Sequence, residues 1–260
     1  MRTLTVLGLV GLLGALGPVA ATATARAAAG SARPAGLVCD PQGCDDAQAP
    51  ALVRMATPGT VRLVATGATV RVSAVLADTS GVREASVDVF DGGGDYVDTY
   101  PLSREAGAAG GPQTWGAQIG LGPDAVPGGW RLDLDVTDVR DHWTWYEAAG
   151  SFPVALDTQL DFDAAPERPL PSGAIAVAGQ LRRLVPFQDH LPYAGATVLL
   201  SFRPAGSTRY GEVGRAVTAA DGRYRARFSA ARGDGTWRAS FAGADGYAAR
   251  TSRSDTIDVR

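Results

Sequence analysis

Histidine and cysteine, which often take part in catalysis, are scarce in this 260-residue sequence. There are two histidines, His142 and His190, and both lie among residues that are typical of turns. They fall in different predicted domains, so a Ser-His-Asp or Cys-His site would have to be assembled across domains. We therefore expect a protein that is not an enzyme.

Aspartates are the next candidates for chemistry, and four of them lie close together at Asp133, Asp135, Asp138 and Asp141. The first two would share one face of a strand, and the last two would lie near the turn that follows. Calcium takes about six to eight oxygen ligands, so these carboxylates predict a calcium site, although their spacing is not that of an EF-hand. The alternative is that they solvate the outer face of a sheet and pair with arginines such as Arg131. Further carboxylates that could add ligands are Asp91, Asp95 and Asp98, or alternatively Asp157, Asp161 and Asp163.

Aromatic side chains are densest at Trp143, Trp145 and Tyr146. In an extended segment the two tryptophans would point the same way, as the rings of a sugar-stacking platform do. This pattern indicates a glycan-binding or cell-envelope-binding surface. The alternative is that alternating aromatics near a hairpin pack across strands or cover one end of the core.

The two cysteines, Cys39 and Cys44, flank the turn-like residues 40–43 (DPQG). This short spacer would bring the two thiols together in an oxidising compartment. We expect a local disulfide between them.

The N-terminal residues predict export from the cell. Arg2 precedes an apolar run from Leu4 to Ala20, and small residues typical of a cleavage site follow, so residues 1–29 are interpreted as a signal peptide. No stable membrane anchor is expected, and the predicted location is extracellular. The net charge of −3, without an arginine-rich run among aromatics, argues against a nucleic-acid partner.

Hydrophobic residues alternate with period two through most of the remaining chain. Val70, Val72, Ala74 and Leu76 would occupy one face of a strand, and the same alternation recurs between Gly, Pro, Asp and Ser turns. Short strands without helical crossovers predict an all-β fold, an antiparallel sandwich over residues 57–156. Residues 30–56 show little periodicity and are predicted to be a flexible segment held by the disulfide.

A second set of strands follows a segment rich in proline and aspartate. Residues 157–172 contain the run APERPLP, which indicates a semi-rigid linker. Alternation resumes over residues 173–260 and predicts a second antiparallel sandwich. The sequence thus predicts two immunoglobulin-like β-sandwiches in tandem, with Trp115, Trp130 and Trp237 as core residues.

Both predicted sandwiches resemble known families. Residues 78–89 (DTSGVREASVDV), 128–130 (GGW) and 136–138 (VTD) resemble bacterial immunoglobulin-like or fibronectin-type-III-like domains. Residues 192–198 (PYAGATV) and 218–224 (TAADGRY) resemble carboxypeptidase-regulatory-like domains, which have a transthyretin-like sandwich. These resemblances imply a fold and a secreted, accessory or adhesive module, and they imply no catalytic residue.

The function that these observations favour is a secreted, non-catalytic interaction or adhesion-type protein. Its partner would be a protein or an envelope glycan, bound through loop tips or strand edges. A glycan-binding module that uses the aromatic cluster and a calcium-stabilised spacer are the alternatives, and no other cofactor is expected.

Overall fold

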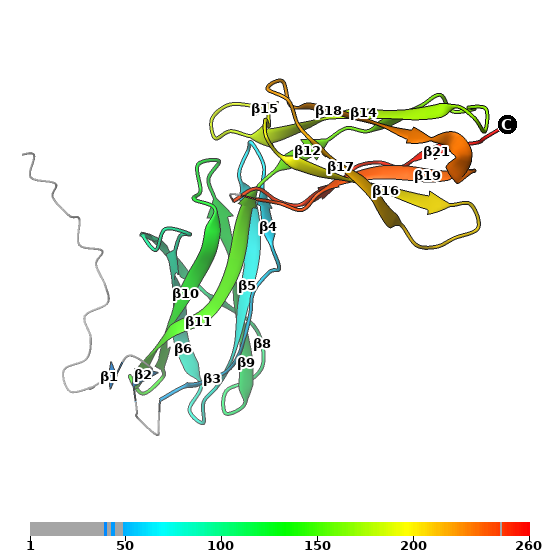
Figure 1. Cartoon of the computed structure of the whole chain (residues 1–260). Coiled ribbons are helices and arrows are strands. Elements are labelled where there is room, and N and C mark those ends of the chain that lie inside the picture. The colour runs from blue at the N-terminus through cyan, green and yellow to red at the C-terminus, as the bar shows by residue number, and fades with distance from the viewer. Residues whose placement is uncertain (1–38, 41–42, 45–48, 245) are drawn as a thin grey trace, which may run out of the picture. The chain divides into compact units, whose positions relative to one another are not determined.

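The computed structural model describes residues 39–40, 43–44, 49–244 and 246–260 (Figure 1). Most of these residues are in strands, and the one helical element in this part of the chain is the short 3-10 helix η1, Ala230–Arg232. The predicted all-β class is therefore confirmed. No helix among the described residues is long and apolar enough to cross a membrane.

The period of two in the sequence produces strands with one buried face. In β5, Ala68–Ala77, the side chains of Val70, Val72, Ala74 and Leu76 are buried, whereas the residues between them are exposed or half-buried. Successive side chains of a strand point to opposite faces, so this alternation alone determines which face packs inward. The predicted orientation of this strand is confirmed.

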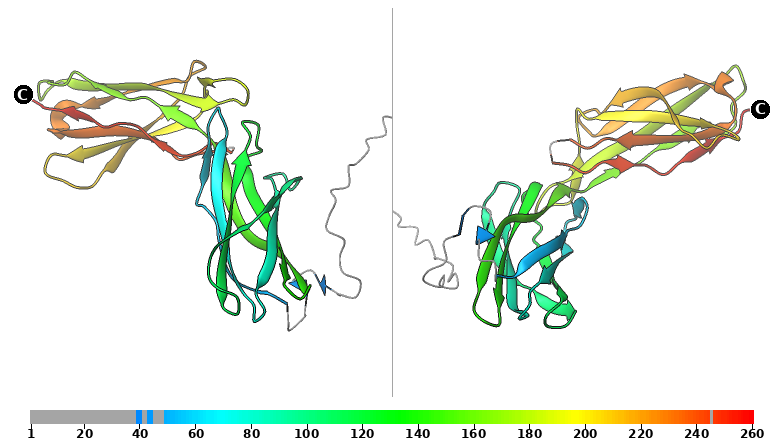
Figure 2. Two further views of the ribbon diagram at one scale, coloured as in Figure 1. Left: turned by 180° about the vertical axis from the view of Figure 1, so that it is seen from behind. Right: turned by 90° about the horizontal axis from the view of Figure 1, so that it is seen from below.

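Two sheets enclose the first of two hydrophobic cores (Figures 1 and 2). One sheet has the strand order β4-β11-β10-β6-β7, and the other has the order β3-β5-β9-β8. Neighbouring strands are antiparallel, except that β4 and β11 are parallel. The bounds of these strands are β3 Ala51–Ala56, β4 Val61–Leu63, β6 Val82–Phe90, β7 Tyr96–Pro101, β8 Ser103–Ala106, β9 Pro112–Leu121, β10 Gly128–Asp138 and β11 Trp143–Leu156.

Large side chains from both sheets fill this first core. Trp130 is 2% exposed, and its ring stacks on Phe152 with the centroids 6.0 Å apart. The indole N–H of Trp130 donates a hydrogen bond to the carbonyl oxygen of Val126 at 2.8 Å. Trp115 is also buried. The prediction that these two tryptophans belong to the core is confirmed.

Two further sheets enclose the second core. In one, β14 pairs with β12 and β13 along one edge and with β15 and β18 along the other, and in the second the order is β17-β16-β19-β20, with β21 also paired to β19. The bounds are β12 Thr158–Leu160, β13 Asp163–Ala165, β14 Ala174–Leu184, β15 His190–Pro192, β16 Thr197–Pro204, β17 Gly211–Val217, β18 Arg223–Ser229, β19 Gly235–Phe241, β20 Arg250–Thr251 and β21 Asp255–Ile257.

Aromatic rings occupy the centre of the second core. Trp237 is completely buried, and its ring lies 4.8 Å from that of Phe202 and 5.0 Å from that of Phe228. Burial of a ring of this size is among the larger single contributions to a small core, about 2–3 kcal/mol from the apolar area removed from water. The predicted core position of Trp237 is confirmed.

Two predicted boundaries differ from the structure. The flexible segment predicted over residues 30–56 contains β3, which pairs with β5. The linker predicted over residues 157–172 contains β12 and β13, and both pair with β14. The prolines of that segment begin at Pro166, so every residue from 157 to 165 retains the N–H that a ladder needs. Leu160 and Ala164 also face the core, which gives these short strands an apolar side.

Candidate functional site

A concave site lies on the outer face of the sheet that contains β12, β13, β14 and β18. We call it the hollow, and its volume is about 830 Å³. Its lining residues are Asp161, Phe162, Asp163, Ala178, Gly179, Gln180, Val217, Ala219, Asp221, Arg223, Tyr224 and Arg225. Sites of this size accommodate small molecules or short chain segments.

The hollow exists because the central strand carries small residues where its neighbours carry long ones. Ala178 on β14 lies opposite Asp163 of β13 on one side and opposite Arg225 of β18 on the other. All three side chains are exposed. A methyl group therefore forms the floor, with an acidic wall and a basic wall on either side of it.

The acidic wall presents two exposed carboxylates, Asp161 and Asp163. The carboxylate of Asp161 accepts a hydrogen bond from Nη2 of Arg182 at 2.9 Å. Asp163 has neither an ion pair nor a side-chain hydrogen bond among the residues that the structure describes. The negative charge of Asp163 is thus the one on this wall that is available to a ligand.

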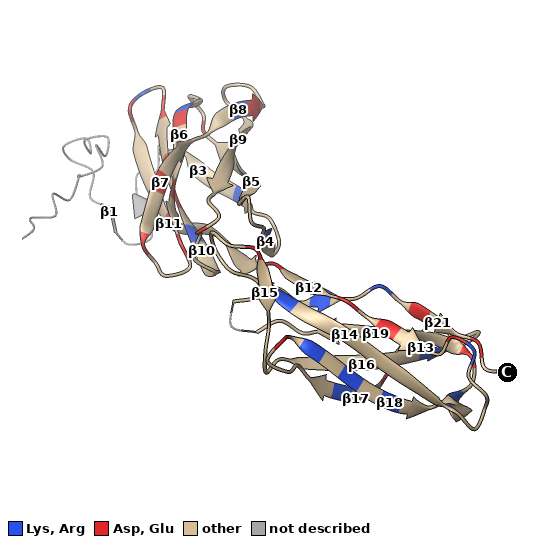
Figure 3. Ribbon diagram, turned by 90° about the horizontal axis from the view of Figure 1, so that it is seen from above, with Lys and Arg blue, Asp and Glu red and all other residues tan. Residues whose placement is uncertain are grey.

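The basic wall comes from β18, which carries Arg223, Arg225 and Arg227 at alternate positions, all exposed. Figure 3 colours the arginines of the strands blue. Nε of Arg223 lies 3.7 Å from the carboxylate of Asp221. Within the described part of the chain, Arg225 and Arg227 have no ion pair. Arg225 lines the hollow, and Arg227 lies beyond it on the same face of the strand.

Beneath the floor, Gly179 and Tyr224 hold β14 and β18 against the connection between β12 and β13. The two residues are opposite each other on β14 and β18, and the hydroxyl of Tyr224 donates a hydrogen bond to the backbone oxygen of Asp161 at 2.7 Å. A Cβ atom at position 179 would lie 2.0 Å from that same oxygen, so only glycine fits. Burial, and then the nearby charge of Asp161, raises the pKa of the Tyr224 hydroxyl, which therefore remains a donor.

Asp221 and Gly222 form the turn that leads into β18. Gly222 has φ of +74°, a conformation that favours glycine, and the carboxylate of Asp221 accepts a hydrogen bond from the N–H of Arg223 at 3.0 Å. The amide of Gln180 donates to the backbone oxygen of Asp221 at 2.8 Å. This turn holds the entrance of β18 against the floor of the hollow.

Of the four aspartates predicted to bind calcium, Asp138 instead organises a turn. Its carboxylate is completely buried and accepts hydrogen bonds from the backbone N–H groups of Arg140 and His142, both at 2.8 Å. Its second oxygen lies 2.9 Å from Nδ1 of His142. Burial opposes the charged form, but these bonds outweigh it and lower the pKa of Asp138.

The other three aspartates of the predicted calcium site lie in different surroundings. Asp133 is buried, accepts a hydrogen bond from the N–H of Ala148 at 2.8 Å, and lies 3.3 Å from Nε of Arg131. Asp141 is exposed and pairs with Arg83. Asp135 is half-buried on β10. The described residues contain no group of three or more acidic, His or Cys side chains placed to hold a metal ion.

The aromatic cluster does not form the exposed platform that glycan stacking requires. Trp143 is 7% exposed, whereas Trp145 and Tyr146 are half-buried. The hydroxyl of Tyr146 donates to the backbone oxygen of Pro50 at 2.8 Å and accepts from the N–H of Leu52 at 3.0 Å. The hydroxyl of Tyr146 thus attaches β11 to the segment around β3.

The predicted disulfide would join Cys39 and Cys44, for which the structure describes the backbone but not the side chains. The strands β1, Cys39–Asp40, and β2, Gly43–Cys44, are antiparallel, and their register places Cys39 opposite Cys44. The side chains of both cysteines lie outside the described residues, so the disulfide stays a prediction. The signal peptide predicted over residues 1–29 also lies outside them.

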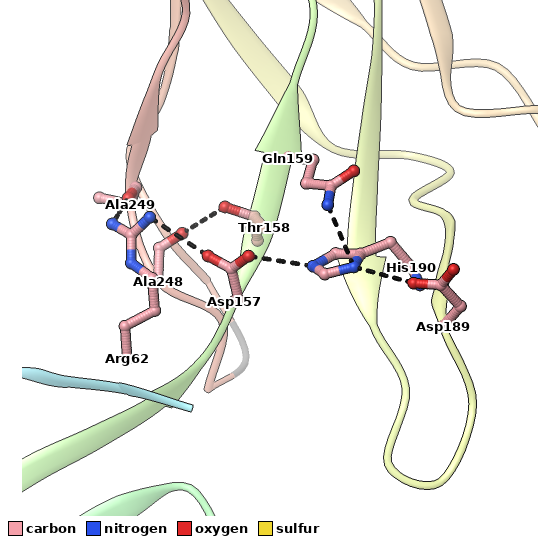
Figure 4. A network of polar contacts seen from close by, with 8 residues as sticks. All are labelled: Arg62, Asp157, Thr158, Gln159, Asp189, His190, Ala248 and Ala249. Atoms are coloured by element: carbon pink, nitrogen blue, oxygen red, sulfur yellow. Dashed lines mark hydrogen bonds and ion pairs between the residues drawn. The ribbon is translucent and has the colours of Figure 1, made fainter. Parts of the chain in front are cut away.

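Both histidines contact carboxylates, but neither contact contains a nucleophile. Nε2 of His190 lies 3.0 Å from the carboxylate of Asp157, and its Nδ1 lies 3.3 Å from Asp189 and from the amide of Gln159 (Figure 4). Asp157 also accepts a hydrogen bond from Arg62 at 3.2 Å. Both ring nitrogens of His190 thus lie within hydrogen-bond distance of neighbouring side chains.

Comparison with known proteins does not identify a family. No model of a known protein family matches the chain, and no curated protein matches its sequence. Among solved structures, Salmonella alpha-2-macroglobulin reacted with methylamine is 14% identical with a TM-score of 0.38; the alignment covers 86% of this chain and 15% of that one. A chimeric titin Z1Z2-Z1Z2 tandem is 15% identical with a TM-score of 0.28, covering 81% of this chain and 99% of that one.

A third solved structure is the Yersinia pseudotuberculosis adhesin InvE, at 12% identity and a TM-score of 0.29, with 81% of this chain and 60% of that one covered. The chain thus spans only about 15% of the length of the macroglobulin that it matches. At these TM-scores the likenesses carry no argument about function.

Proposed function

We propose that this chain is a non-catalytic binding protein that holds its ligand in the hollow. The observation that carries the proposal is the register of Asp163, Ala178 and Arg225, which leaves two unpaired, opposite charges on either side of an alanine floor. Exposed charges without partners are free to contact a ligand without breaking an internal contact. With the signal peptide expected over residues 1–29, the protein would act outside the cell.

The composition of the hollow favours recognition over catalysis. Its lining contains carboxylates, guanidinium groups, an amide and a tyrosine, but no Ser, Cys, His or Lys. Its three carboxylates, Asp161, Asp163 and Asp221, are all exposed to water. A proton-donating carboxylic acid in a hydrolase is normally shielded from water so that it stays protonated. The hollow instead offers fixed charges and hydrogen-bonding groups, as a binding site does.

The proposal is tested by closing the hollow and comparing the result with an equivalent change beside it. Ala178→Leu adds bulk to the floor, whereas Ala176→Leu adds the same bulk to the same exposed face of β14 outside the lining. Both variants and the parent chain would be titrated with oligosaccharides, short peptides, diamines and dicarboxylates, with amide NMR shifts as the readout.

A ligand supports the proposal if Ala178→Leu abolishes its binding and Ala176→Leu does not. Circular dichroism and melting temperature would confirm that both variants remain folded. The proposal is wrong if every ligand that binds is equally insensitive to both substitutions, because binding would then occur elsewhere on the chain.

A further inference from the structure

We infer that the ligand of the hollow is a short extended peptide with a free ammonium group at one end and a free carboxylate at the other, lying across the strands. This inference rests on the proposed function, because it specifies what the hollow binds. The ammonium group would contact Asp163, and the carboxylate would contact Arg225.

A ligand in the hollow meets two charges that have no partner in the described part of the chain. Each wall also carries a second charge, but both are already engaged, since Asp161 pairs with Arg182 and Arg223 lies 3.7 Å from Asp221. The unpaired charges that remain in the lining are one carboxylate, Asp163, and one guanidinium. They are of opposite sign and lie in register on either side of the floor.

The two opposite charges disfavour ligands whose charges are all of one sign. A polyanion in the hollow would be attracted by Arg225 but repelled by Asp163, and a polycation would meet the reverse. Repulsion of this kind is a common source of specificity, because it penalises the wrong ligand rather than strengthening the right one. A ligand that carries both charges gains from both walls.

The distance between the two charged residues determines the length of the ligand. Neighbouring strands are about 4.8 Å apart, so the two charged residues are separated by about 10 Å of sheet across Ala178. An extended peptide spans at most about 3.3–3.6 Å per residue, so three residues match this separation. A guanidinium group can bind a terminal carboxylate through two parallel hydrogen bonds, which fixes that end.

The experiment uses the full chain and triglycine, with glycine and diglycine as shorter probes. Calorimetry and amide NMR shifts should show weak binding of triglycine, with a Kd on the order of 1 mM, as expected for a ligand this small. N-acetyl-triglycine and triglycine amide each lack one terminal charge and should bind about tenfold more weakly. Glycine is too short to reach both walls and should also bind more weakly.

Variants of the two walls complete the test. Asp163→Asn and Arg225→Gln should each weaken triglycine binding by about tenfold. The double exchange Asp163→Arg with Arg225→Asp should restore it, since the peptide can bind in the opposite direction. Arg227→Gln is the matched control, because it removes an exposed, unpaired arginine from the same face of β18 outside the lining, and it should leave binding unchanged.

Three outcomes would overturn the inference. Equal binding of free and blocked triglycine would show that the termini are not recognised. Binding of poly-L-glutamate that depends equally on Arg225 and Arg227 would indicate a polyanion lying along β18 instead. A different ligand that passes the Ala178→Leu test while triglycine does not bind would leave the proposed function intact and remove only this inference. If nothing passes that test, both fail.

Discussion

The two regions of the chain use their charged residues differently. Residues 57–156 contain six arginines and 13 aspartates and glutamates, whereas residues 157–260 contain 14 arginines and 11 acidic residues. In the first region, Asp133 and Asp138 are buried and satisfied by backbone N–H groups. In the second, Asp161 and Asp163 are exposed beside a hollow. Asp138 of the first region thus organises a turn, whereas Asp163 of the second region remains available for a ligand.

The largest expected effect comes from removing Asp138. Asp138→Ala removes a buried carboxylate and leaves the N–H groups of Arg140 and His142 without their acceptor, and we expect a loss of about 2–4 kcal/mol in the free energy of unfolding. Urea unfolding at pH 7 measures it. Asp163→Ala, an exposed aspartate of the second region, is the control and should change stability by less than about 0.5 kcal/mol. Equal losses in the two variants would contradict the contrast between the regions.

The lowered pKa of Asp138 predicts that the free energy of unfolding depends on pH. The pKa of Asp138 is lowered in the folded state from an ordinary value of 3.8, so the folded state binds fewer protons than the unfolded state near that pH. Its stabilising contribution should be complete well above pH 3.8 and should be lost as the pH falls through the folded value. The stability difference between the parent chain and Asp138→Asn, measured from neutral pH downward, should therefore narrow in acid.

The next largest loss of stability is expected for Gly179→Ala, beneath the floor of the hollow. Gly179→Ala would place a Cβ atom 2.0 Å from the backbone oxygen of Asp161, and we expect a destabilisation of about 1–3 kcal/mol from the forced shift. Gly211→Ala on β17 is the matched control, because nothing lies within 4 Å of its added Cβ. Chemical denaturation of both variants measures the difference, and similar stabilities would show that the contact at position 179 relaxes without cost.

A smaller effect is expected for Tyr224→Phe. This change removes the hydrogen bond to Asp161 but keeps the buried ring, so the loss should be about 1 kcal/mol. A melting curve measures the loss of stability, and NMR shifts at residues 161–163 should report displacement of the acidic wall. Unchanged shifts there would mean that the hydroxyl does not position that wall.

The smallest effect is expected for Asp133→Asn. Burial, with smaller contributions from Glu147 and Asp88, raises the pKa of Asp133, although the N–H of Ala148 and the charge of Arg131 oppose this shift. An acid with a raised folded pKa costs stability once it ionises, so this cost appears as the pH rises above 3.8 through the folded value. Asp133→Asn should therefore be neutral or more stable by up to about 1 kcal/mol at pH 7, and the gain should vanish in acid.

The strands and their buried faces could be predicted from the sequence because they depend on a local alternation. The pattern that placed Val70, Val72, Ala74 and Leu76 inward holds in the structure, and so do the core positions of Trp130 and Trp237. The first half of the predicted linker forms strands because its prolines are confined to residues 166–171, which leaves residues 157–165 able to pair with β14.

The hollow could not be predicted, because it depends on register between distant segments. The alternation that points Tyr224 inward also points Arg223 and Arg225 outward, and this signal is present in the sequence. That Arg225 has Ala178 beside it, and Asp163 beyond, follows only from the pairing of three strands. The calcium hypothesis was weak for a related reason, since spacing cannot show that the oxygens of Asp138 are already occupied by nearby N–H groups.

The contact between Gly179 and Tyr224 also has a consequence for how the strands find their partners during folding. A slip of β14 by one residue would place the side chain of Ala178 or Gln180 where only glycine fits, whereas a slip of β18 by one residue would turn the ring of Tyr224 to the outer face. Gly179 and Tyr224 therefore favour the correct register, because a sheet shifted by one residue is less stable. Asp163 and Arg225 lie on either side of Ala178 in only one alignment of the three strands. By favouring that alignment, Gly179 and Tyr224 also place the two charges of the hollow opposite each other.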